Sequence, residues 1–434
     1  MPDVSPPATT FLHRMPAGWV AATGTVGGPN YDEFIDDDQI IATLARRPDS
    51  VVALDLPQYT AEARRSGLDF TASLPLAARQ LQSMKDAGLY APAPNALFAY
   101  QLTEPDGHVV RALTGLVRGD EFSSSPGEPG RIIRNEDVFA SKVTERQDHI
   151  AALAHLLSPV LLIPAHRQAA YDDLLTRLFD ALPEVPAVTD TDERGVTHAL
   201  WPIEDSDEQI GAVLDTEEFL VADGNHRSLA AQTRSPWALV VIASATGLRI
   251  EPYDRLLRLP DLTPADLIER LTAAGLDLTP AADPTAVTDP TTPAADPGRA
   301  AAGYPDADFL YTAGTYRQIS WPRAQPTPDG ASGERPDSAG LADLPHTLAE
   351  QLILGKALDL APHAEEISYV GGYERRPYLV GEVDAGRATA ALLLRPVTVA
   401  EFTAVNAARR QMPRKSTWFL PKARAGLVIT AITQ

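Results

Sequence analysis

The chain has 434 residues, which suggests two or three domains, and 44% of them are hydrophobic, enough for large buried cores. Its 37 lysines and arginines stand against 58 aspartates and glutamates, and this net charge of −21 argues against nucleic acid or an anionic membrane as the main partner. The sequence contains no cysteine, which excludes disulfides, thiolate metal sites and cysteine nucleophiles. With no recognisable secretory signal or membrane-spanning apolar run, we expect a cytoplasmic protein.

Apolar runs separated by turn residues predict the elements of the first part of the chain. Residues 50–56 have the composition of a strand, and residues 77–87 have the spacing of a helix that ends at Gly88. The runs 97–102 and 109–116 flank the turn EPDGH, which favours a β-hairpin because Asp-Gly tolerates positive φ. Beyond it we expect a helix at 146–157, a strand at 160–164 and a helix at 168–182.

The middle of the chain alternates strands and helices. Residues 197–203, 218–221 and 237–244 are predicted strands, and 237–244 is the most strand-like run of the sequence, with 248–253 as a pairing partner. Helices are expected at 205–214 and, after a polar turn, at 224–233.

Two segments, 281–303 and 322–345, are rich in Pro, Ala and other loop residues without periodicity, which predicts mobile insertions. Order returns with helices at 347–358 and 398–408 and strands at 389–394 and 427–432. We therefore expect an α+β protein with mixed sheets. Its predicted divisions are an N-terminal α/β region (1–135), a core (136–280), the insertions around a short ordered stretch (281–345) and a C-terminal α/β segment that completes the fold (346–434).

The segment VADGNHRS, at the end of a predicted strand, has the composition of an anion-binding turn. We expect Asp223 to cap the following helix and Gly224 to let a ligand approach the backbone. Helix N–H groups, together with Asn225, His226, Arg227 and Ser228, would add donors at the same place. A capped turn with solvated polar residues is the alternative interpretation.

A second cluster, RIIRNEDVFASKVTER, places Glu136, Lys142, Glu145 and Arg146 shortly before or within a predicted helix. A carboxylate here would serve as a general base or magnesium ligand, and the cations would neutralise phosphate. The alternative is a solvated charge run with internal salt bridges.

Two further segments complete the candidate site. In MPRKSTWFLPKARAG, the cations Lys415, Lys422 and Arg424 and the hydroxyl of Ser416 surround two aromatic residues, Trp418 and Phe419. The loop GGPNYDE displays Asn30, Tyr31 and Asp32 and has the form of a site rim. The nine histidines are scattered along the sequence and form no zinc-binding motif, so the sequence does not identify a metal.

These motifs together resemble the bacterial family called domain of unknown function 1015. The resemblance runs over nearly the whole chain, through PNYD, TGLV, IIRNE, K-x-x-E-R, VADGNHR, EPYDR and MPRKSTWFLPK. The chain departs from the usual pattern at three positions. Asn225 stands where the family has a second histidine, Asn30 where it has a second proline, and Arg395 where it has an asparagine.

The ADGNHR turn is also similar to the signature turn of the ParB/sulfiredoxin superfamily, which binds nucleotide phosphates at a helix N-terminus. This resemblance implies a ParB/sulfiredoxin-like nucleotide-binding core. Sulfiredoxin chemistry needs a cysteine, which this chain lacks, and DNA clamping fits poorly with a net charge of −21. The branch that remains is that of the small-molecule kinases, such as free serine kinases.

The resemblance therefore implies a kinase that uses ATP or ADP with Mg²⁺ to phosphorylate the hydroxyl of a small metabolite, serine or a serine-like compound first. Residues 223–228, with Lys415 and Ser416, would hold the nucleotide, and Glu136 or Asp32 would accept the proton or hold Mg²⁺. Lys142, Glu145, Arg146 and His226 complete the catalytic candidates. Two other functions stay open: a non-catalytic regulator that binds a nucleotide or phosphometabolite, and a phosphohydrolase. The sequence also leaves open a homodimer.

Overall fold

The computed structural model describes residues 10–22, 24–123, 128–136, 138–204, 206–284, 307–322, 341–371 and 375–432. The chain divides into two compact units, Met1–Leu248 with Pro421–Gln434, and Arg249–Leu420. The segment boundaries expected from the sequence, after residues 135, 280 and 345, differ from these. The reason is that pairing between distant segments, which composition does not reveal, decides where a unit ends.

The first unit is built around a mixed sheet with the strand order β5-β10-β7-β11-β4-β3-β9-β8. Strand β11 lies inside this sheet, parallel to β7 and antiparallel to β4, and its apolar run WALVVIA is buried almost throughout. The bounds are β3 Phe98–Thr103, β4 Val109–Arg118, β5 Ile132–Ile133, β7 Val160–Pro164, β8 Val188–Thr191, β9 Thr197–Pro202, β10 Phe219–Asp223 and β11 Trp237–Ala243.

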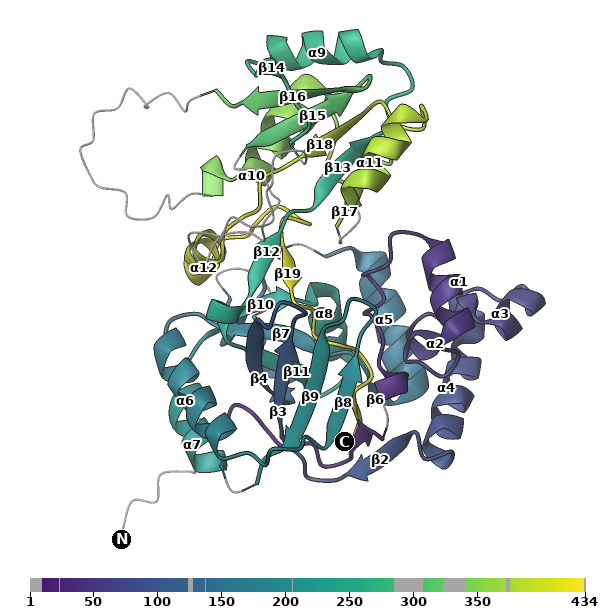
Figure 1. Ribbon diagram of the computed structural model, residues 1–434, viewed down its shortest axis with the longest axis vertical. Coiled ribbons are helices and arrows are strands. Elements are labelled where there is room, and N and C mark those ends of the chain that lie inside the picture. The colour runs from purple at the N-terminus through teal and green to yellow at the C-terminus, as the bar shows by residue number, and fades with distance from the viewer. Residues whose placement is uncertain are drawn as a thin grey trace. The chain divides into compact units, whose positions relative to one another are not determined.

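Helices flank this sheet, with α6 and α7 together on one side of the unit and α1 to α4 gathered on the other (Figure 1). Asp69 caps α4 by accepting a hydrogen bond from the backbone N–H of Ala72, and α4 buries Leu74, Leu81 and Met84. The bounds are α1 Asp37–Arg46, α2 Val52–Asp55, α3 Ala61–Ser66, α4 Phe70–Asp86, α5 Ala140–Leu153, α6 Gln168–Asp180, α7 Asp207–Leu214 and α8 Asn225–Arg234.

A smaller sheet of the first unit has the order β2-β1-β20-β6 and contains the last strand of the chain. Strand β20 pairs antiparallel with β1 and with β6, so the C-terminal segment returns to complete the unit in which the chain begins. This return places Lys422 and Arg424 among residues of the first 250 positions. The bounds are β1 Gly18–Ala21, β2 Tyr90–Ala93, β6 His155–Leu156 and β20 Val428–Ala431.

The second unit contains an antiparallel sheet in the order β14-β16-β15-β18-β13-β17 and the strand pair β12-β19. Leu256, Leu310 and Leu392 belong to its buried core. The bounds are β12 Arg249–Glu251, β13 Asp254–Leu257, α9 Pro264–Ala273, β14 Asp277–Ala281, β15 Asp308–Thr312, β16 Thr315–Ser320, α10 Pro345–Leu348, a π-helix Ala349–Ala357, β17 Ile367–Val370, α11 Arg375–Asp384, β18 Ala390–Leu393, α12 Val399–Ala407 and β19 Trp418–Leu420.

The α+β class with mixed sheets is confirmed, and so is the hairpin of β3 and β4, in which Phe98 pairs with Thr114. The strand predicted at 50–56 is wrong, because this run forms the short helix α2. Val52, Ala53 and Leu56 pack with Ile40 and Leu44 of α1, and a short apolar run does not distinguish a buried helix from a buried strand.

Two other predictions need correction. Residues 248–253 do not pair with β11, because β12 pairs with β19 of the second unit instead. Helix α5 begins at Ala140, before the predicted start at 146, and ends at Leu153, so that Leu156 lies in β6. Most of the two predicted insertions, residues 285–303 and 323–340, lies outside the described residues. Within the described part of the chain, no helix is both long and apolar enough to cross a membrane.

Candidate functional site

The turn between β10 and α8 is held by charged groups on both sides of Gly224. Gly224 has φ +94° and is itself the N-cap residue of α8, without a side-chain cap. Asp223 therefore does not cap the helix, contrary to the sequence-based prediction. Its carboxylate accepts hydrogen bonds from Lys422 Nζ at 2.8 Å and from the Arg227 guanidinium at 2.6 Å. Burial alone would raise the pKa of Asp223, but these two cations hold it well below its usual value.

The guanidinium of Arg227 is buried and turned back over this turn. It donates to Asp223, to Asn30 Oδ1 at 2.9 Å and to the carbonyl of Pro159. A Cβ on residue 224 would lie 3.1 Å from Arg227 Cζ, so glycine is needed here for space as well as for φ. Burial would lower the pKa of Arg227, but the Asp223 carboxylate raises it. Both terminal nitrogens of Arg227 therefore donate hydrogen bonds within the protein.

The other side chains of the turn pack against the segment that precedes α5. His226 Nε2 accepts a hydrogen bond from the backbone N–H of Phe139 at 3.0 Å, and the two rings stack at 5.9 Å. Ser228 Oγ donates to the carbonyl of Asn225 and accepts from Arg134 Nε at 2.9 Å. Asn225, His226 and Ser228 are all buried, so the turn is anchored on both flanks.

Asn30 connects the N-terminal loop to this turn. Besides accepting from Arg227, its amide donates to Glu33 Oε1 at 2.7 Å and to the carbonyl of Ala423 at 3.0 Å. Burial raises the pKa of the Glu33 carboxyl, although Lys422 and the hydrogen bonds from Asn30 act in the opposite direction. Three segments singled out from the sequence therefore meet here: the GGPNYDE loop, the ADGNHR turn and the PKAR end of the C-terminal motif.

A pocket of about 250 Å³, which we call the Glu33 pocket, opens beside this meeting point. Charged side chains form much of its wall. Lys422, which donates to Asp223 of the turn, and Glu33 both line the pocket, so the hydrogen bonds of the turn extend to the pocket wall. The lining residues are Gly28, Pro29, Glu33, Phe34, Gln39, Ala42, Thr43, Arg46, Asp192, Glu193, Arg194, His198, Lys422, Ala423 and Arg424.

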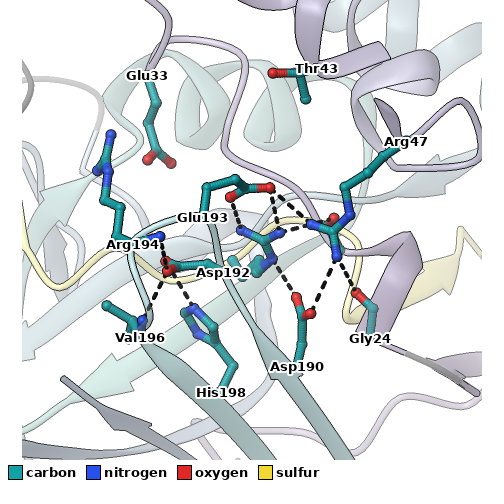
Figure 2. A network of polar contacts seen from close by, with 12 residues as sticks. Gly24, Glu33, Thr43, Arg47, Asp190, Asp192, Glu193, Arg194, Val196 and His198 are labelled. Carbon is teal, nitrogen blue, oxygen red and sulfur yellow. Dashed lines mark hydrogen bonds and ion pairs between the residues drawn. The ribbon is translucent and has the colours of Figure 1, made fainter. Parts of the chain in front are cut away.

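The far wall of the Glu33 pocket is the turn between β8 and β9, which the sequence-based reasoning missed. Asp190 is buried and pairs with Arg424 Nε at 2.5 Å. Glu193 pairs with Arg47 at 2.9 Å (Figure 2). His198 lies between Asp192, at 3.4 Å, and the Tyr100 hydroxyl, at 2.7 Å. The sequence contained a signal for this wall of the pocket. Side chains alternate along a strand, so Asp190 lies on the same buried face as Val188, and a buried carboxylate needs a cation as its partner.

The second predicted cluster is divided by the structure. Lys142 and Glu145 form an exposed i,i+3 pair at 2.9 Å, as the salt-bridge interpretation expects. Arg146 is buried, 3.6 Å from Asp55 Oδ1 and 4.3 Å from the centre of the Tyr31 ring. Glu136 is partly buried between β5 and α5. Asp32 is partly buried as well, and its charge raises the pKa of Arg227.

Lys415 and Ser416 belong to the second unit. Lys415 has φ +54°, and its Nζ donates to the Tyr253 hydroxyl at 3.3 Å. Arg255 donates to the carbonyl of Lys415 at 3.0 Å, and Ser416 Oγ donates to the carbonyl of Pro413 at 2.6 Å. These contacts hold the RKS turn against β13.

Among the residues that the structure describes, no group of three or more histidine, aspartate or glutamate side chains is arranged to hold a metal ion. Mg²⁺ commonly binds through one or two carboxylates together with substrate phosphates. A nucleotide-bound Mg²⁺ would therefore need fewer protein ligands than such a group supplies.

Comparison with known proteins places the chain in a family. No curated protein matches it. A conserved hypothetical protein from Pyrococcus furiosus is similar at 14% identity and a TM-score of 0.35, covering 72% of this chain and 95% of that one. A free serine kinase in complex with AMP (12% identity, TM-score 0.35) covers 71% and 87%, and C-terminally truncated SbnI from Staphylococcus aureus (12%, 0.36) covers 72% and 84%. The family model described as "Protein of unknown function (DUF1015)" matches residues 14–295, and the chain therefore belongs to this family.

Proposed function

We propose that this protein binds a nucleotide through its phosphates in the Glu33 pocket and transfers a phosphoryl group to the hydroxyl of a small metabolite. The observation that carries the proposal is the presence, in one pocket, of a carboxylate with a raised pKa and a fixed ammonium group. Glu33 and Lys422 both line the pocket. Phosphoryl transfer needs a group that accepts the hydroxyl proton and cations that stabilise charge on the transferring oxygens.

Glu33 is the group that would accept the proton. A general base works best when its pKa lies near the working pH, and burial moves the Glu33 carboxyl in that direction. Two hydrogen bonds from Asn30, one from the backbone and one from the side chain, fix Glu33 Oε1 in place. The sequence-based candidates for this role are Asp32 and Glu136, and Asp32 is the immediate neighbour of Glu33.

Cations of the pocket would hold the phosphates. Arg46, Arg194, Lys422 and Arg424 line its wall in a protein that is strongly acidic as a whole. Asp223 holds Lys422, and Asp190 holds Arg424, so both cations are positioned before any ligand arrives. In this assignment Asp223 and Arg227 are positioning residues, since they act on the ligand through Lys422 and Asn30.

The size of the pocket limits what it can enclose. Sites for drug-sized ligands are typically about 300–1,000 Å³, and the Glu33 pocket, at about 250 Å³, is slightly smaller. This volume suits the phosphate end of a nucleotide or a small phosphorylated metabolite. Mg²⁺ would enter with the phosphates.

A non-catalytic nucleotide or phosphometabolite sensor is the second candidate, and one observation favours it. Lys422 and Arg424 are already paired with Asp223, Asp190 and Glu193. Pairing of this kind preserves a binding site but reduces the charge available to a transition state. The ligand affinity of such a sensor would change little when Glu33 is replaced by a neutral residue.

The test combines binding and turnover. The purified protein is titrated with ATP, ADP, CTP and GTP in Mg²⁺ while Tm is followed, and label transfer from the stabilising nucleotide to serine and other small hydroxyl compounds is then measured. A ligand that binds only the folded state raises stability by about 2.7 kcal/mol at a hundredfold excess over Kd. If none of the nucleotides raises Tm, the proposal fails.

Glu33→Gln separates the two candidates, because it keeps the shape of the side chain and removes the base. We expect this variant to bind the nucleotide and to lose at least about 100-fold in turnover. Glu62→Gln is the matched control, since Glu62 is exposed on α3 and pairs only loosely with Arg79, at 3.7 Å. Turnover that survives Glu33→Gln would remove Glu33 from the role of base.

A further inference from the structure

We propose that a second, smaller cavity of the first unit, between Arg146 and Arg227, is a binding site for a single tetrahedral oxyanion of the phosphate or sulfate class. The cavity measures about 40 Å³ and is separate from the Glu33 pocket in its lining. Its lining residues are Tyr31, Asp55, Arg146, His149, Ile150, His155, Leu156, Leu157, Ser158, Val160, Arg227, Ala231, Ala238 and Leu239. The proposal does not depend on phosphoryl transfer in the Glu33 pocket.

Two almost completely buried guanidinium groups line this cavity. Arg146 is 4.3 Å from the centre of the Tyr31 ring and 5.1 Å from that of Phe70, so aromatic faces fix the plane of its guanidinium. Arg227 is fixed by Asp223 and Asn30. Since neither group can move out to water, the site is built before a ligand binds.

Each guanidinium has a hydrogen-bond donor left over. Within the described residues, the buried Nε–H of Arg146 and the buried Nε–H of Arg227 have no acceptor. A buried donor without a partner costs free energy, and the cost is larger for a charged group. Because both arginines line the cavity, we expect an acceptor bound in it to satisfy these donors, and an oxyanion supplies several.

Asp55, the one carboxylate among the described residues of the lining, is already engaged. Asp55 accepts from Ser158 Oγ at 2.8 Å and lies 3.6 Å from Arg146 and 3.4 Å from His149. Among the described residues of the lining, the two guanidinium groups of Arg146 and Arg227 stand against this one carboxylate. This excess of cations favours an anion over a neutral guest.

Size and shape select the ligand. One water needs roughly 10–15 Å³ measured in this way, so a cavity of about 40 Å³ holds about three waters, comparable to one tetrahedral oxyanion. Much of the remaining wall is apolar, with Ile150, Leu156 and Leu239. Of the polar side chains in it, Ser158 donates to Asp55, and the Nε2 atom of His149 lies 3.0 Å from the carbonyl of Leu54. The occupant would be a free phosphate or sulfate ion, or the terminal phosphoryl group of a small ester.

The experiment follows Tm and calorimetric heat while the full-length protein is titrated, in separate arms, with sodium phosphate, sodium sulfate and methyl phosphate at constant ionic strength. Sodium chloride is the reference. We expect saturable stabilisation by the tetrahedral anions. Binding of phosphate and sulfate alone identifies a free-anion site, whereas binding of methyl phosphate alone identifies a phosphoryl subsite.

Two variants address the cavity by different means. Arg146→Lys keeps the charge and removes the guanidinium donors, and Ala238→Val fills the cavity from β11 without touching a charge. Each should weaken anion binding by about tenfold or more. Arg131→Lys, at a half-buried arginine paired with Glu121, is the matched control and should bind as the parent does.

Absence of any saturable anion effect, or an effect that survives both Arg146→Lys and Ala238→Val, would overturn the proposal. Because no nucleotide and no turnover enter this experiment, its failure leaves the function proposed for the Glu33 pocket untouched. Failure of nucleotide binding likewise leaves the oxyanion site untouched.

Discussion

Two ion pairs of the first unit have nearly the same local geometry and very different surroundings. Asp223 and Arg227 are four residues apart and 2.6 Å from each other, and Lys142 and Glu145 are three residues apart at 2.9 Å. The side chains of the first pair are 16% and 7% exposed, whereas those of the second are 51% and 35% exposed. Both pairs come from segments that the sequence singles out as candidate anion sites.

The difference shows that local charge spacing does not identify a site. The exposed pair is solvated, and such a pair stabilises a protein by about 0–1 kcal/mol. The buried pair belongs to a network that reaches Lys422, Asn30 and Glu33 and so forms one side of a pocket. Burial turns an ordinary i,i+4 contact into part of a site, because charges without water must find fixed partners.

The largest expected effect comes from breaking the buried pair. Arg227→Ala leaves Asp223 buried with Lys422 as its remaining cation and removes the donor to Asn30. We expect a loss of about 3–5 kcal/mol in the free energy of unfolding, measured by urea denaturation. Arg234→Ala, at an exposed position near the end of the same helix, is the control and should cost less than about 0.5 kcal/mol. A loss for Arg227→Ala no larger than the control's would contradict the buried network.

The next effect tests the backbone on which that pair is built. In Gly224→Ala, a Cβ must accept φ +94° and lie 3.1 Å from Arg227 Cζ. A left-handed conformation costs an L-residue about 1–2 kcal/mol, and the midpoint of urea unfolding should fall accordingly. Gly381→Ala, within α11 and with open space around the new methyl group, should leave stability unchanged or raise it. Equal effects of the two substitutions would argue against strain at the turn.

A pH titration sharpens the comparison at Glu33. The folded-state pKa of Glu33 is raised, so the carboxyl binds its proton more tightly in the folded than in the unfolded protein. Its contribution to stability is complete below the unfolded pKa, about 4.3, and is lost as pH rises through the folded pKa. Glu33→Gln should therefore raise Tm at pH 7 relative to the parent, and the gain should shrink toward pH 4. A variant that is less stable than the parent at pH 7 would be inconsistent with this sign.

The smallest effect is expected at the exposed pair. Lys142→Ala should change the free energy of unfolding by no more than about 1 kcal/mol, and the change should diminish in high salt, since the exposed charges are screened. Denaturant curves at low and high salt measure both quantities. A cost comparable with that of Arg227→Ala would mean that exposure does not separate the two pairs.

Local features of the sequence were sufficient for much of the fold. The β3–β4 hairpin follows from alternation and the Asp-Gly turn, and the strand-turn-helix of β10 and α8 follows from an apolar run, a glycine and a helical pattern. Each depends on residues only a few positions apart, which a window on the sequence contains. Gly224 was also singled out from the sequence, as a residue that lets a ligand approach the backbone, whereas its φ of +94° and its contact with Arg227 come from the structure.

The partners of charged residues were decided by the tertiary structure. Asn30 and Arg227 are 197 positions apart, and Asp223 and Lys422 are 199 apart, so no local pattern contains either contact. Sequence resemblance brought these segments to attention together, but it pointed to Asp32 and not to Glu33. Which of two neighbouring carboxylates faces the pocket depends on the path of the loop and on Asn30.

The sequence alone determined the α+β class, the net negative charge, the absence of cysteine chemistry and the segments that carry the family's motifs. The tertiary structure decided which of those motifs became buried, because burial depends on strand pairing between segments hundreds of residues apart, such as β1 with β20. Once such pairing removes water from a charged side chain, the free-energy cost of a buried charge without a partner is high. The surrounding residues then set its ion-pair partner, its pKa and its chemical role.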